Sequence, residues 1–236
     1  METAVIICNG PSLKAVPNEW LDRFYTFGSN RVFLKYTPKH MTVVDVKMVH
    51  TAKLQKEMVI GLAGAEEVCL SVDSSKMLAK RYPDGFPSNF EILEWWNYYD
   101  ANNGNKLLPV FAKNPGEPLV SGGTVTYGML QLAWRRGFKR ILLVGLNHTF
   151  RDPRGDHFDS RYNEGVGIPY EKENTKDGEF GRGAGKWWWS EKQFVAKTNM
   201  FYYVASQFYA QNGGEIINCT PDTKCSVFPI DDWRAY

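Results

Sequence analysis

The chain has 236 residues, of which 43% are hydrophobic, 14% aromatic and 23% charged. This content excludes a disordered protein, and because no segment has an apolar run of about 18 residues, we expect no membrane span. The 28 Lys and Arg are balanced by 26 Asp and Glu, so the net charge is only +2. Such a balance argues against a nucleic acid polymer as partner and leaves a globular protein of one or two domains.

Four cysteines stand at irregular spacings, without a Cys-x-x-Cys pair. They suggest neither a disulfide scaffold nor a zinc ribbon. The first residues enter an apolar segment directly, without the basic start and the cleavage site of a signal peptide. We therefore expect a cytoplasmic protein.

Short apolar runs rich in β-branched residues alternate with segments of helical length. The runs cover residues 5–8, 42–44, 67–72, 141–144 and 215–219, and a further strand is expected at 24–26. Continuous apolar runs are typical of strands that are covered on both faces, so the alternation predicts an α/β, Rossmann-like fold with a mostly parallel sheet. Ligands bind outside the carboxyl ends of such strands, which makes the polar residues there the candidates for a site.

Two helices have clear boundary signals. The first begins with Ser121 as its N-cap and ends at Gly137. The second begins at Ser190, where Gln193 completes a capping box, and ends at residues 212–214.

Residues 150–186 show no hydrophobic period. A stretch of this length is typical of either an active-site lid or a surface insertion, and we interpret it as a lid within one nucleotide-binding domain over residues 1–236. Residues 80–118 fit either a helical insertion or a subunit contact, which leaves a homo-oligomer open. At least one indole of residues 187–189 is expected to pack against the lid or a ligand ring, because three consecutive Trp side chains cannot face one core.

The loops after the first two strands contain candidate nucleotide contacts. Gly10, Pro11 and Ser12 fit either a plain strand-to-helix turn or an anion site at a helix start. Asn30 is expected close to Asn9, where two amides would hydrogen-bond a base or a ribose. An Asx turn explains Asn30 equally well.

The third candidate is the expected helix start at Ser121, Gly122 and Gly123. Glycine in a helix costs about 1 kcal/mol relative to Ala, so two glycines in the first turn indicate that something approaches the backbone closely. A phosphate fits that description, and close packing against another strand is the alternative.

The fourth candidate follows the strand at 141–144 and consists of Gly145, Asn147 and His148. His157 lies within the expected lid beside two aspartates, which are expected to raise its pKa toward the working pH. Either histidine is a candidate general base, and a surface histidine beside acids is the plainer alternative for His157. The basic residues at 135–140 we interpret as cations at a helix C-terminus.

Together these motifs resemble one superfamily. Residues 9–13 read Asn-Gly-Pro-Ser-Leu, and residues 145–150 read Gly-Leu-Asn-His-Thr-Phe. With Asn30 and Ser121-Gly122, they are similar to the superfamily of motility accessory factor glycosyltransferases, glycosyltransferase family 42 sialyltransferases and 6-hydroxymethylpterin diphosphokinase-like proteins. The resemblance implies that Asn9, Asn30, Ser121 and Gly122 contact the nucleotide of a donor.

The sequence departs from that superfamily at two places. The superfamily commonly has an acidic residue where Asn147 stands, and its catalytic histidine near the lid has no counterpart around Trp187 and Trp189.

Three hypotheses follow. The leading one is a glycosyltransferase that uses a nucleotide-activated sugar and a sugar or small-alcohol acceptor, with His148 or His157 as base and no metal site assigned. The second is diphosphate transfer from ATP to a pterin-like alcohol, with Mg²⁺ as cofactor. The third is a non-catalytic nucleotide-binding protein. The carboxylates available for Mg²⁺ in the second hypothesis are Asp45, Asp152, Asp156 and Asp159.

Overall fold

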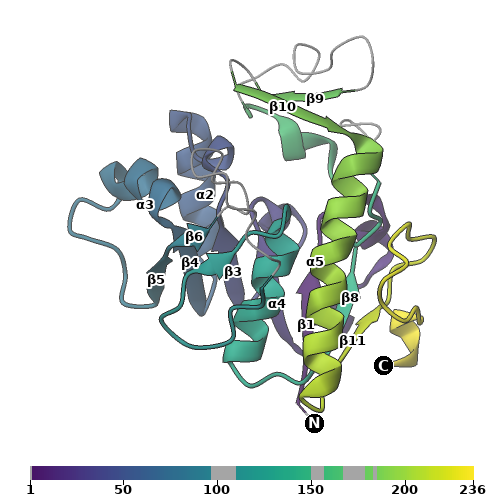
Figure 1. Cartoon of the computed structure of the whole chain (residues 1–236). Coiled ribbons are helices and arrows are strands. Elements are labelled where there is room, and N and C mark those ends of the chain that lie inside the picture. The colour runs from purple at the N-terminus through teal and green to yellow at the C-terminus, as the bar shows by residue number, and fades with distance from the viewer. Residues whose placement is uncertain (1, 97–109, 150–156, 167–178, 183–184) are drawn as a thin grey trace.

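Seven parallel strands form the central sheet of the computed structural model, in the order β11-β8-β1-β2-β3-β4-β5 (Figure 1). The structure describes residues 2–96, 110–149, 157–166, 179–182 and 185–236. The predicted α/β fold is confirmed. The strands of this sheet are β1 (Thr3–Ile7), β2 (Tyr25–Ser29), β3 (His40–Val43), β4 (Glu67–Ser71), β5 (Phe90–Leu93), β8 (Arg140–Val144) and β11 (Glu215–Asn218). Two smaller sheets pair β6 (Trp95–Trp96) with β7 (Leu119–Val120), and β9 (Glu179–Arg182) with β10 (Gly185–Ser190).

The central strand β1 shows why the apolar runs become strands. Its residues Ala4, Val5, Ile6 and Ile7 are fully buried. Because side chains alternate along a strand, Ala4 and Ile6 enter the core on one face, while Val5 and Ile7 enter the core on the other. Both faces of β1 must therefore be covered.

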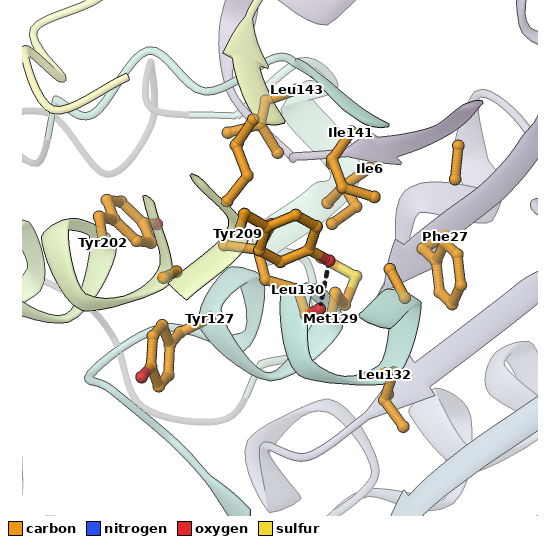
Figure 2. Packing of buried hydrophobic residues seen from close by; sticks show 14 of the residues in the cluster. Ile6, Phe27, Tyr127, Met129, Leu130, Leu132, Ile141, Leu143, Tyr202 and Tyr209 are labelled. Carbon is orange, nitrogen blue, oxygen red and sulfur yellow. Dashed lines mark hydrogen bonds between the residues drawn. The ribbon is translucent and has the colours of Figure 1, made fainter. Parts of the chain in front are cut away.

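One face of the sheet is covered by α4 (Val125–Arg135) and α5 (Glu191–Gln211), which lie side by side in Figure 1. Figure 2 shows how Tyr209 of α5 enters this core and donates a hydrogen bond of 2.9 Å from its hydroxyl to the carbonyl of Leu130. Tyr127 of α4 is also fully buried there. The two helices thus share one apolar core with the sheet.

The other face carries the helices α1 (Asn18–Leu21), α2 (Ala52–Ala63) and α3 (Val72–Leu78). Trp20 of α1, Met58 and Leu62 of α2 and Leu78 of α3 belong to the second core. No helix in the described part of the chain is long and apolar enough to cross a membrane. Short 3-10 helices occur at Pro11–Ala15, Val32–Leu34, Val46–Met48, Ala79–Arg81, Ser160–Asn163 and Trp233–Ala235.

The start of α4 differs from the prediction. The helix begins at Val125 with Thr124 in the N-cap position, and Ser121 lies in a turn before it, where its carbonyl accepts from the N–H of Thr124. Gly122 and Gly123 have φ angles of 52° and 88°. Left-handed residues end helical geometry, so the two glycines belong to this turn and not to the first turn of the helix.

Helix α5 begins directly after Ser190 and ends at Gln211, as the sequence predicted. Gly213 follows with a φ angle of 73°, the left-handed conformation that commonly ends a helix. The Ser190 side chain, and with it the predicted capping box, lies outside the described part of the chain.

The described part of residues 80–118 is not a helical insertion. It adds β5 to the edge of the main sheet, and β6 then pairs with β7. A Cβ atom built on Gly128 would overlap the ring of Trp95, so α4 and this indole are in direct contact. Residues 97–109 lie outside the described ranges.

Two pieces of the expected lid have regular structure. Residues 160–163 form a 3-10 helix, and β9 and β10 form an antiparallel hairpin that leads into α5 at the top of Figure 1. The expectation of an irregular stretch is therefore wrong for these residues. Residues 150–156, 167–178 and 183–184, like the side chains of Trp187 to Trp189, lie outside the described part.

The basic residues near the end of α4 are engaged in structural contacts. Arg136 forms an ion pair with Glu67, and the Nε of Arg140 lies 2.5 Å from a carboxylate oxygen of Glu215. Arg135 donates to two backbone carbonyls. These contacts support the structural interpretation of the basic patch.

Candidate functional site

The strand order reverses at β1. The chain proceeds outward from β1 through β2 to β5 and then returns to place β8 on the opposite side of β1. Ligands of open α/β sheets bind beyond the carboxyl ends of the strands at such a switch point. The loops that follow β1, β2 and β8 therefore form the candidate site.

The loops after β1 and β8 lie directly against each other. The N–H of Cys8 donates to the carbonyl of Val144 at 2.8 Å, and the N–H of Gly10 donates to that of Gly145 at 2.9 Å. A Cβ atom on Gly10 would overlap Gly145, and one on Gly145, where φ is 73°, would overlap the carbonyl of Cys8. The close approach of the two loops accounts for both glycines without a ligand.

Ser12 and Asn147 also engage each other. The Oδ1 atom of Asn147 accepts from the backbone N–H of Ser12 at 3.1 Å and from its hydroxyl at 2.7 Å. The expected helix at Pro11 is a 3-10 helix of five residues, Pro11–Ala15. The groups that the sequence offered to an anion are therefore used to hold the two loops together.

Asn9 and Asn30 differ from these residues, because each has a buried acceptor atom with no donor. Asn9 donates from Nδ2 to the Ser29 hydroxyl at 3.2 Å, which places its amide beside the end of β2, next to Asn30. No residue in the described ranges donates to the Oδ1 atom of either asparagine. An unpaired buried acceptor costs about 1–3 kcal/mol, so the structure retains two costly groups at the ends of adjacent strands.

A segment of the expected lid, residues 157–166, packs against both asparagines. The N–H of Phe158 donates to the carbonyl of Asn9 at 3.0 Å, and the Tyr162 side chain lies beside that of Asn30. The ring of His157 stacks on that of Tyr162, with centroids 3.9 Å apart. The structure thus brings Asn9, Asn30 and His157 together.

The prediction of a raised pKa for His157 is wrong. Burial lowers the pKa of His157 to about 4, although a contact with the Asn9 carbonyl opposes the shift. Asp159 accepts from the side chain and the backbone of Arg161, so this carboxylate is already paired. Asp156 lies outside the described residues.

His148 lies in other surroundings, against α5. It has a φ angle of 58° and is 5% exposed, and its ring centroid lies 5.7 Å from that of Tyr202. Burial lowers the pKa of His148, and the nearby Asn199 side chain partly offsets the effect. Both candidate bases are therefore neutral at physiological pH.

The glycine turn before α4 faces the same helix. A Cβ atom on Gly123 would lie 3.5 Å from the Thr198 hydroxyl, and one on Gly122 would overlap the Tyr127 ring. The Thr124 hydroxyl lies 3.0 Å from that of Tyr202, the residue that also contacts His148. Packing within the protein thus accounts for Gly122, and the left-handed φ angle of 88° accounts for Gly123.

Lys197 is a site residue that the sequence analysis missed. Its Cε atom would lie 3.9 Å from a Cβ on Gly123, and the residue is 8% exposed. Burial lowers the pKa of its ammonium group to about 8. The available signal was its position four residues before Phe201, which places a lysine on the buried face of α5.

The carboxylates proposed for Mg²⁺ are used in local contacts where the structure describes them. Asp45 accepts from the N–H of Lys47 at 3.0 Å, and Asp159 is paired with Arg161. Among the described residues, no three His, Cys, Asp or Glu side chains gather as a metal site would require. Asp152 lies outside these residues.

Comparisons with known proteins add no relative, since no family model, curated protein or solved structure matches the chain. The resemblance to the glycosyltransferase and diphosphokinase superfamily rests on the motifs and stays a prediction.

Proposed function

We propose that the protein is a nucleotide-dependent transferase whose donor nucleoside binds at the carboxyl ends of β1 and β2. The observation that carries this proposal is the pair of buried, unpaired acceptors, Asn9 Oδ1 and Asn30 Oδ1. The hydroxyls of a ribose or the amino group of a base would donate to both. A ligand of this kind would remove the cost of leaving the two acceptors unpaired.

Lys197 and the turn at Ser121–Gly123 suit the phosphate of the donor. An ammonium group supplies charge to a phosphate, and the Lys197 side chain lies next to Gly123 in this turn. Because the net charge of the chain is only +2, phosphate affinity depends on such placed groups and not on a broad basic surface.

Transfer of a sugar to a hydroxyl acceptor needs a base, and two neutral histidines are available. His157 lies beside Asn9, at the proposed nucleoside site, and His148 lies beside Tyr202 on the side of Lys197. A neutral imidazole can accept the proton of the acceptor hydroxyl as its oxygen bonds to the anomeric carbon of the sugar, while the bond from that carbon to the phosphate oxygen breaks and the nucleotide leaves. Sugar transfer is therefore our leading reaction, and a cytoplasmic location is part of the proposal.

A thermal-shift screen of nucleotides and nucleotide sugars, each with and without Mg²⁺, tests the proposal. A ligand at about 100 times its Kd stabilises the folded state by about 2.7 kcal/mol, which gives a clear increase in Tm. We expect a nucleotide sugar to raise Tm without Mg²⁺. An effect of ATP only with Mg²⁺ would favour diphosphate transfer, tight binding without turnover would favour a non-catalytic protein, and no effect of any nucleotide would refute the proposal.

A further inference from the structure

Arg31 connects the end of β2 to residues 157–166. The residue is only 2% exposed. Its Nη1 atom donates to three backbone carbonyls, at 2.6 Å to Arg161, 2.7 Å to Tyr162 and 3.0 Å to Glu164. Its Nη2 atom forms an ion pair of 2.6 Å with Glu57 of α2. One guanidinium therefore bonds three carbonyls of the turn at residues 161–164 and, at the same time, a carboxylate of α2.

The segment that Arg31 holds is the one that covers the two asparagines. Tyr162 contacts Asn30, the residue immediately before Arg31, and Phe158 donates to the carbonyl of Asn9. Asn30 has a left-handed φ angle of 54°, so the chain turns between Asn30 and Arg31. Asn30 therefore belongs to the proposed ligand site, and Arg31, the next residue, holds residues 157–166 over the same site.

We propose that Arg31 is a positioning residue, which fixes residues 157–166 against Asn9 and Asn30 so that the binding edge is formed before the ligand arrives. The role in binding rests on the proposed function, whereas the anchoring does not. An edge that is formed in advance spares the ligand the entropic cost of ordering the segment. Arg31 acts through the segment and does not itself contact the ligand.

The chemistry of the contact requires arginine. A guanidinium is planar and presents five N–H donors in a fixed geometry, whereas an ammonium group is compact and has three. Lysine at position 31 would keep the positive charge, but its single nitrogen could not bond the three carbonyls and the Glu57 carboxylate together, as Nη1 and Nη2 do. Arg31→Lys therefore keeps the positive charge of the side chain and removes only the guanidinium geometry.

Hydrogen exchange of backbone amides tests the anchoring without a ligand. In Arg31→Lys we expect amides within 157–166 to exchange at least about tenfold faster, while those of β1 and β8 keep their wild-type rates, because the segment opens locally. Arg23→Lys, at an exposed site before β2, is the matched control and should change neither. Unchanged exchange in 157–166, or an equal increase in β1 and β8, would overturn the proposal.

Glu57→Gln provides a second variant in case Arg31→Lys does not fold. It removes only the charge of the ion pair, from a carboxylate that is 30% exposed. We expect the same local pattern of faster exchange with a smaller amplitude. Protection in 157–166 equal to that of wild type would count against the anchor.

The binding role is tested with the four ribonucleoside 5′-monophosphates as probes, by titration calorimetry. For a monophosphate that wild type binds, Arg31→Lys should weaken affinity by at least about tenfold, since the ligand would then have to order the segment itself. Equal affinities would overturn the binding role. If wild type bound none of the four, the proposed function and the binding role would both be wrong, and the exchange rates would still decide the anchoring.

Discussion

Asn147 Oδ1 accepts two hydrogen bonds from Ser12, one from its backbone N–H at 3.1 Å and one from its hydroxyl at 2.7 Å. These contacts fasten the loop after β8 to the loop after β1, in addition to the backbone bond from Gly10 to Gly145. The switch point between β1 and β8 is therefore closed by the protein's own groups. We therefore propose that the ligand binds at the neighbouring ends of β1 and β2.

Asn147→Ala should destabilise the protein by about 1–3 kcal/mol, because both donors of Ser12 lose their acceptor. Urea unfolding measures this loss. Asn147→Asp is the matched control, since a carboxylate accepts the same two bonds, and it should stay within about 0.5 kcal/mol of wild type. Equal stability of the Ala and Asp variants would show that the loops do not depend on this side chain.

The stability of the protein should fall as the pH drops below about 6.5, the pKa of an unfolded histidine. His40 is fully buried, with its Nδ1 atom 3.5 Å from a Glu67 carboxylate that also pairs with Arg136. Burial lowers the pKa of His40, so the unfolded chain binds a proton that the folded chain resists. Burial shifts the pKa values of His148 and His157 in the same direction.

The variant His40→Phe isolates the contribution of this residue. It should flatten the pH dependence of the unfolding free energy between pH 7.5 and 5.5 by up to about 1.4 kcal/mol per pH unit, the limit for one proton. Urea unfolding at several pH values measures the slope. An unchanged slope would mean that His40 takes up its proton equally in both states.

Lys197→Met should make the protein more stable and bind nucleotides less tightly. Burial lowers the pKa of Lys197 to about 8, below the value of about 10.4 in an unfolded chain, so holding the charge at pH 7 costs free energy that declines as the pH rises from 8 to 10. An apolar side chain of similar length removes that cost. Tm should rise, and nucleotide affinity should fall by about tenfold, the size of a lost charge-assisted contact.

Lys192→Met is the matched control on the same helix, because Lys192 is exposed. It should change neither Tm nor affinity. A lower Tm of Lys197→Met together with unchanged nucleotide affinity would assign Lys197 a structural role.

The sequence predicted the sheet wherever strands are buried on both faces, as in β1 and β8, because continuous apolar runs specify such strands. It missed β5, which lies at the sheet edge and exposes Ile92 to 45%. An edge strand with one partner needs no continuous apolar run. It also misplaced the start of α4, because Ser121 resembles an N-cap until the left-handed glycines are seen.

Within the site, the sequence located the right loops but not the state of their side chains. The end of each strand could be predicted, and so could the proximity of Asn9 to the end of β2. The low pKa of His157 could not, because it depends on burial of the ring against Tyr162. Such tertiary contacts produce no periodic pattern of residues that could be recognised in the sequence.

Titration calorimetry of Asn9→Ala and Asn30→Ala tests the central claim most directly. The titrant is a nucleotide or nucleotide sugar that raises the Tm of wild type, and Asn18→Ala, which removes an exposed amide bonded to the carbonyl of Lys35, is the control. We predict that each site variant loses about tenfold or more in affinity, the value of one or two hydrogen bonds to the ligand, while the control binds like wild type. Wild-type affinity in both Asn9→Ala and Asn30→Ala would contradict a nucleotide site at the ends of β1 and β2.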